Sequence, residues 1–348
     1  MRILILGNNY ASEEFYNLFC EDEQNIVFSD IPTTKNYIEF ENINDILEFC
    51  NVNNINLVLI NNEEYIDSGL QELLTNENIS AFSPSIEAIS ITNSKANAKK
   101  FMYKNKIQTP KFAIMEKTQL ALEYIKNSPI PLAIRPDYSS KMETVKFCET
   151  YNQGQKIVND LFLTGNKKII IEDYIEGKNI SVWTISDGFS AKIIGTSVKY
   201  QDEIALFEPD FITEELKERF LNSAIIPTIN ALSTQDEEYI GILGFDFILT
   251  YDNELFLVGY NNFFDDINVN FFTKGYDINW LDVFESCIVG DVFLKYQFIP
   301  KNEYMLSIRN NEKIEFICAK TQNNLEKYIK ELGYDIKLYK EANKIWKY

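Results

Sequence analysis

Hydrophobic and polar positions along the first 92 residues repeat with two different spacings. Short apolar runs typical of buried strands alternate with stretches whose apolar residues recur every three or four positions, as on one face of a helix. The strand patterns cover residues 1–6, 25–28, 57–60 and 80–82, and the helix patterns cover 12–19, 43–50 and 67–75. Strands that alternate with helices predict a parallel sheet with right-handed crossovers. We therefore expect residues 1–92 to form an N-terminal parallel α/β domain.

The pattern changes after residue 92. Thr92 or Asn93 is a suitable N-cap for a helix that runs to about Lys104, and Pro110 ends this helical linker, residues 93–110. Strand patterns then appear at 111–115, 131–135, 144–147 and 168–174, with helix patterns at 118–127 and 151–161. We expect these elements to form a small α+β lobe, residues 111–185.

The second half of the chain continues with strands and fewer helices. Strand patterns cover 180–186 and 191–198, helix patterns cover 214–233 and 280–289, and the C-terminal patterns are strands at 304–309 and 313–318 and a helix at 325–332. We expect a second lobe at residues 186–295 and a small C-terminal α+β unit at 296–348. The fold class is therefore expected to combine α/β and α+β parts.

One predicted hairpin, residues 241–261, carries the strongest chemical signal. Two apolar runs flank a turn at Tyr251-Asp252-Asn253, which is typical of a hairpin. A two-residue turn would bring Asp246, near the start of the first strand, and Asn261, at the end of the second, to a common pocket. A carboxylate beside an amide oxygen suits Mg²⁺, which prefers oxygen ligands and keeps waters and substrate phosphates. The alternative is a surface hairpin with two ordinary polar residues.

Basic residues elsewhere are candidates for phosphate contacts. Lys95, Lys99 and Lys100 lie in the helix after residue 92, where a solvated basic face is the alternative. Arg135 ends an apolar strand pattern. A guanidinium at a strand end frequently contacts phosphate, and a surface ion pair explains it equally well.

Composition narrows the chemistry further. No apolar run approaches the roughly 20 residues of a membrane helix. The net charge of −19 argues against nonspecific binding of nucleic acid, which needs a basic face. Five scattered cysteines fit reduced thiols, so a cytoplasmic location is expected. Histidine is absent, which excludes Ser-His-Asp and Cys-His catalysis and every His-ligated metal.

The order of these motifs resembles the ATP-grasp superfamily, and most closely the phosphoribosylamine–glycine ligases of purine synthesis. The resemblance spans residues 1–289. It rests on the segments MRILILGNN, INLVLINNEE with ISAFSPS, NSKANAKKFMYKNKIQTP, PLAIRPD, IIIEDYIEG and GFDFILTYDNELFLVGYNN. It also rests on the spacing of the family's metal ligands, which are an acid, a second acid and an asparagine. Asp246 and Asn261 match the first and third of these positions.

The resemblance implies an N-terminal Rossmann-like domain followed by two lobes that enclose ATP. The residues that match its nucleotide-binding positions are Lys95 and Arg135 for the phosphates, Glu172, Asp173 and Ile175 for the adenine hinge, and Asn179 for the ribose. The implied reaction uses ATP and Mg²⁺ to phosphorylate a substrate carboxylate, which an amine then converts to an amide. Both substrates would be small molecules.

Several positions depart from the family pattern. Gly259 occupies the middle metal position, and Asn179 replaces a ribose-binding glutamate. The glycine-rich loop over the phosphates is replaced by residues 140–144, SKMET, and an expected arginine is Phe263. The missing carboxylate and the missing loop are expected to weaken the binding of both Mg²⁺ and ATP.

Two functions remain open from the sequence. The first is an ATP-dependent carboxylate–amine ligase with a substrate other than that of glycine ligase. The second is a catalytically degenerate ATP-grasp protein that binds a ligand or a partner. A nicotinamide-dinucleotide binder built on Gly7 is disfavoured, because the glycine pattern is incomplete. The sequence identifies neither the acid nor the amine, and it leaves open whether the chain is a monomer or a homodimer.

Overall fold

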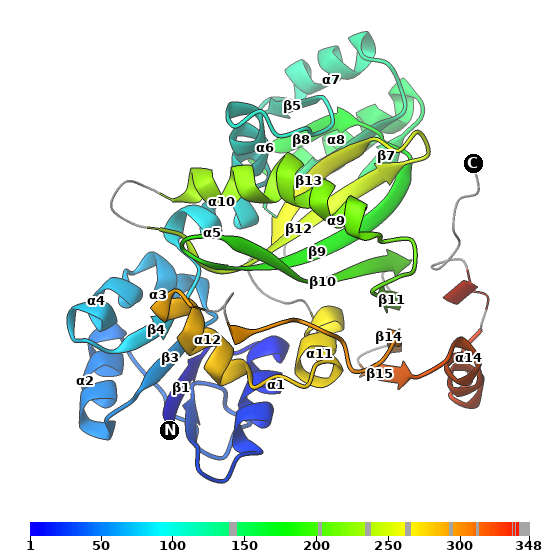
Figure 1. Ribbon diagram of the computed structural model, residues 1–348. Coiled ribbons are helices and arrows are strands. Elements are labelled where there is room, and N and C mark those ends of the chain that lie inside the picture. The colour runs from blue at the N-terminus through cyan, green and yellow to red at the C-terminus, as the bar shows by residue number, and fades with distance from the viewer. Residues whose placement is uncertain are drawn as a thin grey trace.

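The computed structural model describes residues 1–138, 145–200, 204–233, 238–261, 266–291, 295–310, 313–335, 337 and 339–340. These residues form three sheets with associated helices (Figure 1). One sheet is parallel and two are antiparallel, so the expected combination of α/β and α+β parts is confirmed. No helix within these ranges is long and apolar enough to cross a membrane.

The N-terminal sheet is parallel and has the strand order β2-β1-β3-β4. Its elements are β1 Arg2–Leu6, α1 Tyr10–Cys20, β2 Ile26–Ser29, α2 Ile43–Asn53, β3 Leu57–Ile60, α3 Glu63–Asp67, α4 Leu70–Asn76 and β4 Ser80–Phe82. All four expected strands are present. The helix expected at 67–75 is instead two helices, because Gly69 adopts a φ of 80° between them, a backbone conformation that glycine adopts readily.

Two helices connect this sheet to the next, α5 Ile86–Asn93 and α6 Lys95–Lys104. Ser94 ends the first and caps the second, since its side chain accepts a hydrogen bond from the Asn97 backbone N–H. The expectation that Thr92 or Asn93 caps α6 was wrong.

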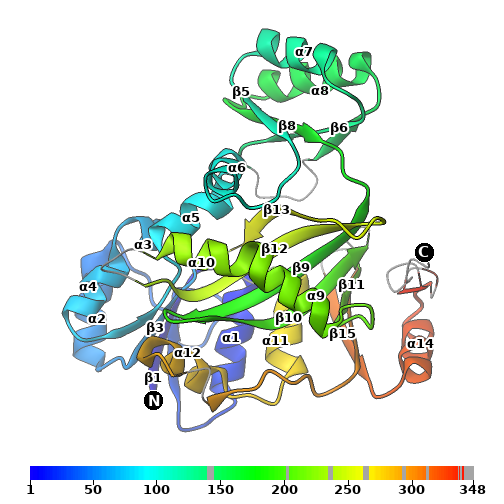
Figure 2. The same ribbon diagram turned by 45° about the horizontal axis from the view of Figure 1, so that its top comes forward.

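The small antiparallel sheet has the order β5-β8-β6-β7. Its elements are β5 Phe112–Met115, α7 Thr118–Asn127, β6 Leu132–Pro136, β7 Lys146–Cys148, α8 Tyr151–Leu163 and β8 Ile169–Asp173. Both helices pack on one face, where residues such as Ile125, Leu132 and Val158 share a core. Figure 2 shows this lobe standing at the top of the molecule, with its helices turned away from the rest.

The third sheet has seven antiparallel strands in the order β13-β12-β9-β10-β11-β14-β15. Its strands are β9 Gly177–Asp187, β10 Ala191–Tyr200, β11 Ile204–Phe207, β12 Ile240–Thr250, β13 Leu255–Asn261, β14 Tyr304–Asn310 and β15 Lys313–Ala319. Its helical segments are α9 Glu214–Phe220, the π-helical turn Leu221–Ile225, α10 Ile226–Leu232, α11 Asp266–Gly275, α12 Trp280–Val289 and α14 Gln322–Glu331. The C-terminal strands therefore extend the same sheet that contains the hairpin.

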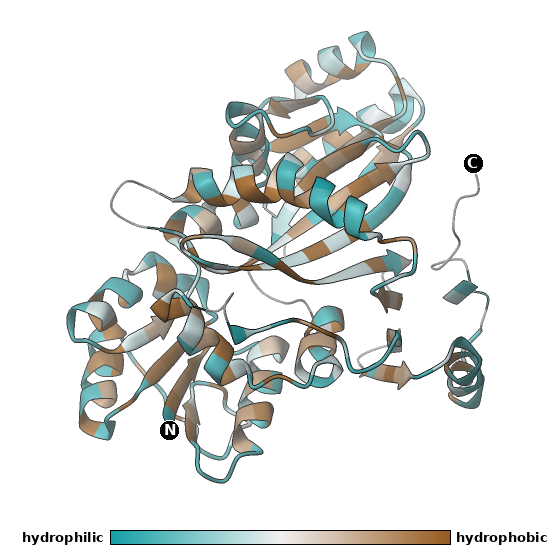
Figure 3. Cartoon of the chain, viewed as in Figure 1, coloured by the Kyte–Doolittle hydropathy of each residue, from teal (hydrophilic) through white to brown (hydrophobic). Residues whose placement is uncertain are grey.

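Both faces of this sheet are covered. Residues of α5, α6, α9 and α10 share one core with β9, β12 and β13. Residues of α1, α11 and α12 share a second core with the opposite face, which includes Trp183. The hydropathy colouring agrees, since apolar residues concentrate along the strands and polar residues on the outer helix faces (Figure 3).

Three details of this sheet differ from the expectations. The helix expected at 214–233 is interrupted by a π-helical turn just before Pro227. Proline has no N–H to close the usual hydrogen bond, which is consistent with a widened turn at this point. The hairpin turn spans four residues, 251–254, and not two. The strand β11 and the helix α11 were missed altogether.

Candidate functional site

Asp246 and Asn261 meet on one face of the hairpin. The Asn261 Nδ2 donates to Asp246 Oδ2 over 2.8 Å, and the Ser181 hydroxyl on the neighbouring strand β9 donates to Asp246 Oδ1 over 2.7 Å. The pairing register places Asp246 opposite Gly259 on β13 and opposite Ser181 on β9. Both carboxylate oxygens are therefore held in place by neighbouring strands of the same sheet.

A buried ionic cluster lies on the side of the small sheet. Glu172, on β8, contacts Lys99 Nζ at 2.6 Å and the Arg135 guanidinium at 2.5 Å. The side chains of Lys99, Arg135 and Glu172 are only 1%, 11% and 7% exposed. The alternative of a solvated basic face is wrong for Lys99, and the ion pair of Arg135 is buried and not on the surface.

Arg135 also connects the two lobes. Its second contact is a hydrogen bond of 3.1 Å from the guanidinium to the backbone carbonyl of Val258 on β13. Val258 directly precedes Gly259, so the guanidinium reaches the strand beside the position where the family pattern has a carboxylate. The Arg135 Nε–H is buried and has no hydrogen-bond partner among the residues that the structure describes.

Lys95, the first residue of α6, completes the group. Burial lowers the pKa of its ammonium, and the nearby positive charge of Arg135 lowers it further. The carboxylates of Asp246, Asp137 and Glu172 act in the opposite direction. The side chains of Lys95, Arg135 and Asp246 are therefore near enough to one another to interact electrostatically, and Asn261 is hydrogen-bonded to Asp246.

Three further residues position this group, of which Asp137 and Ser181 were not recognised from the sequence and Lys99 was considered only for a phosphate contact. Asp137 accepts hydrogen bonds from the Ser94 hydroxyl at 2.7 Å and the Ala96 backbone N–H at 2.8 Å, which fixes the start of α6 against the small sheet. Lys99 anchors the same helix to Glu172. Ser181 orients Asp246. Only Lys99 gave a signal, because it lies one helical turn after Lys95.

The expected adenine hinge, Glu172, Asp173 and Ile175, spans the end of β8 and the connection to β9. Asp173 is half-buried, and its backbone N–H donates to the Lys111 carbonyl at 2.9 Å. Ile175 is half-buried in the short connection to β9. Asn179 is exposed on the same face of β9 as Ser181, because side chains alternate along a strand. The SKMET segment and Phe263 lie outside the described residues.

The donors present fit a magnesium ion that is held mainly by phosphates and water. Asp246 supplies a carboxylate and Asn261 an amide oxygen, a set that Mg²⁺ accepts when a nucleotide provides further ligands. No group of three or more acidic or cysteine side chains that could hold a metal occurs within the described ranges. A Cβ built on Gly259 would meet only Asp246 Oδ2, at 3.7 Å, so space remains beside the carboxylate. A protein-only metal site is therefore not supported.

Comparison with known proteins identifies the family. The model of the phosphoribosylglycinamide synthetase ATP-grasp (A) domain matches residues 93–269, just over half of the chain. The chain belongs to this ATP-grasp family. It is 25% identical to the phosphoribosylamine–glycine ligase of Clostridium acetobutylicum over 292 residues, which cover 73% of this chain and 69% of that protein. It is 24% identical to the enzyme of Fusobacterium nucleatum over 334 residues, covering 82% and 78%.

Solved structures show the same fold. Phosphoribosylamine–glycine ligase from Thermotoga maritima matches with a TM-score of 0.70 and 15% identity, covering 95% of this chain and 96% of that one. Carboxyaminoimidazole ribonucleotide synthase from Asperigillus clavatus, complexed with ATP, matches with a TM-score of 0.72 and 11% identity, covering 98% of each chain. The ATP-grasp resemblance and architecture expected from the sequence are thereby confirmed, and they place the chain among the ATP-grasp carboxylate–amine ligases.

Proposed function

We propose that this ATP-grasp protein is an ATP-dependent ligase that joins a small carboxylic acid to a small amine, with substrates that differ from those of glycine ligase. The single observation that carries the proposal is the pairing of Asp246 with Asn261 within electrostatic reach of Lys95. An oriented carboxylate and amide lie near a half-buried cation there, which suits a metal-bound triphosphate.

The reaction would proceed in two steps. An oxygen of the substrate carboxylate attacks the γ-phosphorus, and the bond to the β,γ-bridging oxygen breaks to release ADP. The amine nitrogen then attacks the acyl carbon of the acyl phosphate, phosphate leaves with the electron pair of the C–O bond, and the nitrogen loses a proton. Most of the catalytic effect in such transfers comes from positioning and charge neutralisation.

The chain's own residues would divide this work. Lys95 would supply positive charge to the phosphates as negative charge develops on the leaving β,γ-bridging oxygen. Ser181 holds the Asp246 carboxylate in one orientation, and Asn261 presents its amide oxygen beside it. A bound Mg²⁺ would neutralise phosphate oxygens between these two side chains and the nucleotide. Arg135 would fix the separation of the lobes through Glu172 and Val258.

A second function is favoured by Gly259 and by the commitment of Arg135 to protein partners. With one metal carboxylate missing and the guanidinium already paired, the fold could bind a ligand or a partner without ligation. Fold alone does not decide between these functions.

Calorimetric titration with Mg-ATP and with ADP separates the two proposals from an inert scaffold. The ligase proposal expects binding of Mg-ATP that Asp246→Asn weakens at least tenfold, and ADP release that depends on adding one acid and one amine from a panel. Absence of binding at millimolar nucleotide would remove the ligase proposal. Turnover of ATP by the unmodified protein would instead remove the degenerate alternative.

A further inference from the structure

The helix α6 lies where the small lobe meets the rest of the molecule (Figure 2). On one side, Ala98 and Met102 share a core with residues of β12 and β13. On the other side, Lys99 pairs with Glu172 of β8. The helix begins at Lys95, the residue expected to meet the phosphates. Whatever holds the first turn of α6 therefore also places the Lys95 ammonium.

Asp137 holds that first turn. The first backbone N–H groups of a helix have no partner within the helix. Here the Lys95 N–H donates to the Asp137 backbone carbonyl at 3.1 Å, and the Ala96 N–H donates to Asp137 Oδ1 at 2.8 Å. The Ser94 hydroxyl donates to the same carboxylate oxygen at 2.7 Å. Asp137 is only 2% exposed, so these hydrogen bonds are shielded from water.

The backbone of Asp137 belongs to the small lobe. It follows β6 directly, and its own N–H donates to the Lys168 carbonyl at 3.1 Å. Arg135 lies two residues earlier, on β6 itself. The two cations expected to meet the phosphates, Lys95 and Arg135, are therefore tied to the same lobe, although Lys95 precedes that lobe in the sequence.

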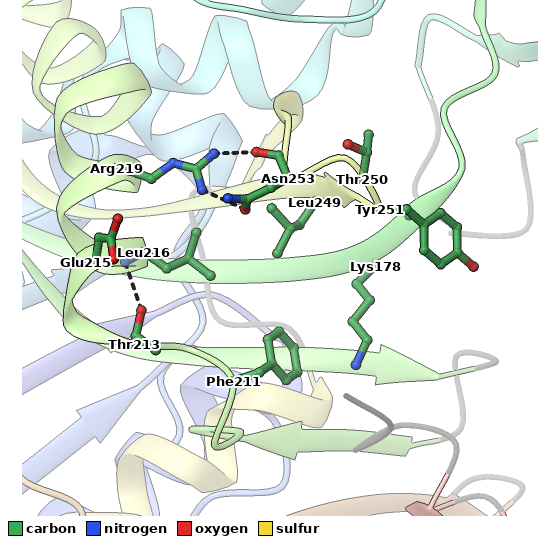
Figure 4. A pocket seen from close by; sticks show the side chains of 11 residues that line it. Lys178, Phe211, Thr213, Glu215, Leu216, Arg219, Leu249, Thr250, Tyr251 and Asn253 are labelled. Carbon is green, nitrogen blue, oxygen red and sulfur yellow. Dashed lines mark hydrogen bonds between the residues drawn. The ribbon is translucent and has the colours of Figure 1, made fainter. Parts of the chain in front are cut away.

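The side chains of the proposed metal site are held separately. Asp246 and Asn261 lie on the hairpin formed by β12 and β13. At the turn of this hairpin, the Arg219 guanidinium of α9 donates to the side-chain oxygen of Asn253 at 2.8 Å and to its backbone oxygen at 2.7 Å (Figure 4). The hairpin is thus anchored to α9. The position of Lys95 relative to the metal side chains then depends on the contacts that hold α6.

The Asp137 carboxylate also affects the charge of Lys95. Burial is the largest influence on the pKa of the Lys95 ammonium and lowers it, and the Arg135 guanidinium lowers it further. The carboxylates of Asp246, Asp137 and Glu172 raise the same pKa. Asp137 therefore acts on Lys95 in two ways, by its hydrogen bonds to the start of α6 and by its negative charge.

We propose that Asp137 is a positioning residue for phosphate binding, which caps α6 from the small lobe and so holds Lys95 beside the nucleotide. Its carboxylate also favours the protonated form of Lys95, the form that attracts phosphate. This inference rests on the proposed function, because Lys95 acts there on a bound triphosphate. Asp137 acts through Lys95 and is assigned no contact with the nucleotide.

Two substitutions separate these contributions. Asp137→Asn keeps an oxygen that can accept the hydrogen bonds from Ser94 and Ala96 but removes the charge, whereas Asp137→Ala removes both. NMR on the full chain without nucleotide follows the hydrogen exchange of the Ala96 amide and the titration of the Lys95 side chain, whose signal is identified by its loss in Lys95→Arg. The matched control is Asp160→Asn, which removes the charge of an exposed acid on α8 of the same lobe.

Asp137→Ala should speed the exchange of the Ala96 amide at least tenfold, which is about the effect of leaving one buried donor unpaired. It should also weaken the binding of Mg-ATP at least tenfold in calorimetry. Asp137→Asn should leave the amide protected and move the titration of Lys95 to lower pH. A shifted titration with a protected amide is not explained by loss of structure at the start of α6. Asp160→Asn should change neither measurement.

Three results would overturn the proposal. They are unchanged exchange of the Ala96 amide in Asp137→Ala, an unchanged titration of Lys95 in Asp137→Asn, and equal affinity of Asp137→Ala and the unmodified protein for Mg-ATP. If Asp137→Ala does not fold, the titration in Asp137→Asn decides. Absence of Mg-ATP binding by the unmodified protein is a different result, which would remove the proposed function. The two NMR measurements need no nucleotide, so they still decide whether Asp137 holds Lys95.

Discussion

Glu172 is predicted to be one of the most sensitive single positions for stability, because it neutralises two buried cations. The substitution Glu172→Gln keeps the volume of the side chain and removes only the charge. At an effective dielectric constant of about 20, an ion pair at the 2.6 Å separation of Lys99 from Glu172 attracts by roughly 6 kcal/mol. The cost of desolvating three ions offsets much of this attraction. Removing one partner of a buried pair typically costs about 3–5 kcal/mol, and we expect Glu172→Gln to fall in this range.

Urea unfolding measures this loss, as the shift of the first cooperative transition. The matched control is Glu116→Gln, because Glu116 pairs with Lys168 at 3.5 Å with side chains 63% and 39% exposed. Such an exposed pair contributes about 0–1 kcal/mol. Similar transitions for the two variants would contradict the reasoning.

A double variant provides a sharper test of the same explanation. If the unneutralised ammonium causes the loss, then Lys99→Met should restore part of the stability of Glu172→Gln, since it removes one unpaired charge. If the hydrogen-bonding geometry of Glu172 were responsible, the second substitution would lower stability further. That second outcome would refute the electrostatic account.

Three further predictions concern the hairpin and Lys95. A Cβ at Gly177 would lie 2.4 Å from the Leu249 carbonyl oxygen, whereas a Cβ at Gly259 would be 3.7 Å from its nearest atom. Urea unfolding should therefore show that Gly177→Ala lowers the free energy of unfolding by about 1–3 kcal/mol. Gly259→Ala should lower it by less than about 0.5 kcal/mol. Gly259→Glu should raise the affinity for Mg-ATP and lower that for metal-free ATP in calorimetry, and equal effects on both would contradict a role beside the metal. Burial lowers the pKa of Lys95, and only the protonated ammonium attracts phosphate. As the pH rises, the affinity for Mg-ATP should therefore begin to fall at a lower pH than it would with a lysine of ordinary pKa. Lys95→Arg should make the affinity nearly independent of pH over the same range.

The sequence predicts the elements whose patterns are long and regular. The strands of the N-terminal sheet, α12 and both strands of the hairpin lie where the apolar spacing places them. The strand β11 was missed, and its place in the sheet depends on a partner far along the chain, since Ile204 pairs with Ile308 on β14. The helix α11 was missed because buried asparagines interrupt its apolar pattern, and Asn268 is buried against Ser197 through a hydrogen bond. Partners distant in sequence decide such positions.

The candidate site was likewise predicted only where its contacts are local in sequence. The hairpin pattern was sufficient to suggest that Asp246 and Asn261 meet, because a hairpin is a local structure. The partners of Arg135 could not be predicted, since Val258 lies 123 positions away and the contact depends on how the two lobes pack. The burial of Lys99 was equally hidden, because a lysine on a helix is normally exposed.

Gly259 and Arg135 are best understood together. Relative to the family pattern, the glycine removes a negative charge and a metal ligand from β13. The guanidinium of Arg135 is hydrogen-bonded to the carbonyl of the preceding residue, Val258, so a fixed positive charge lies beside the position that lost the acid. A triphosphate at this site would meet less repulsion from the protein and would receive less help from a metal. ATP binding is therefore expected to depend less on Mg²⁺ than in a site with both acids. The test is to compare the effect of Gly259→Glu on the affinity for Mg-ATP, which should rise, with its effect on the affinity for metal-free ATP, which should fall.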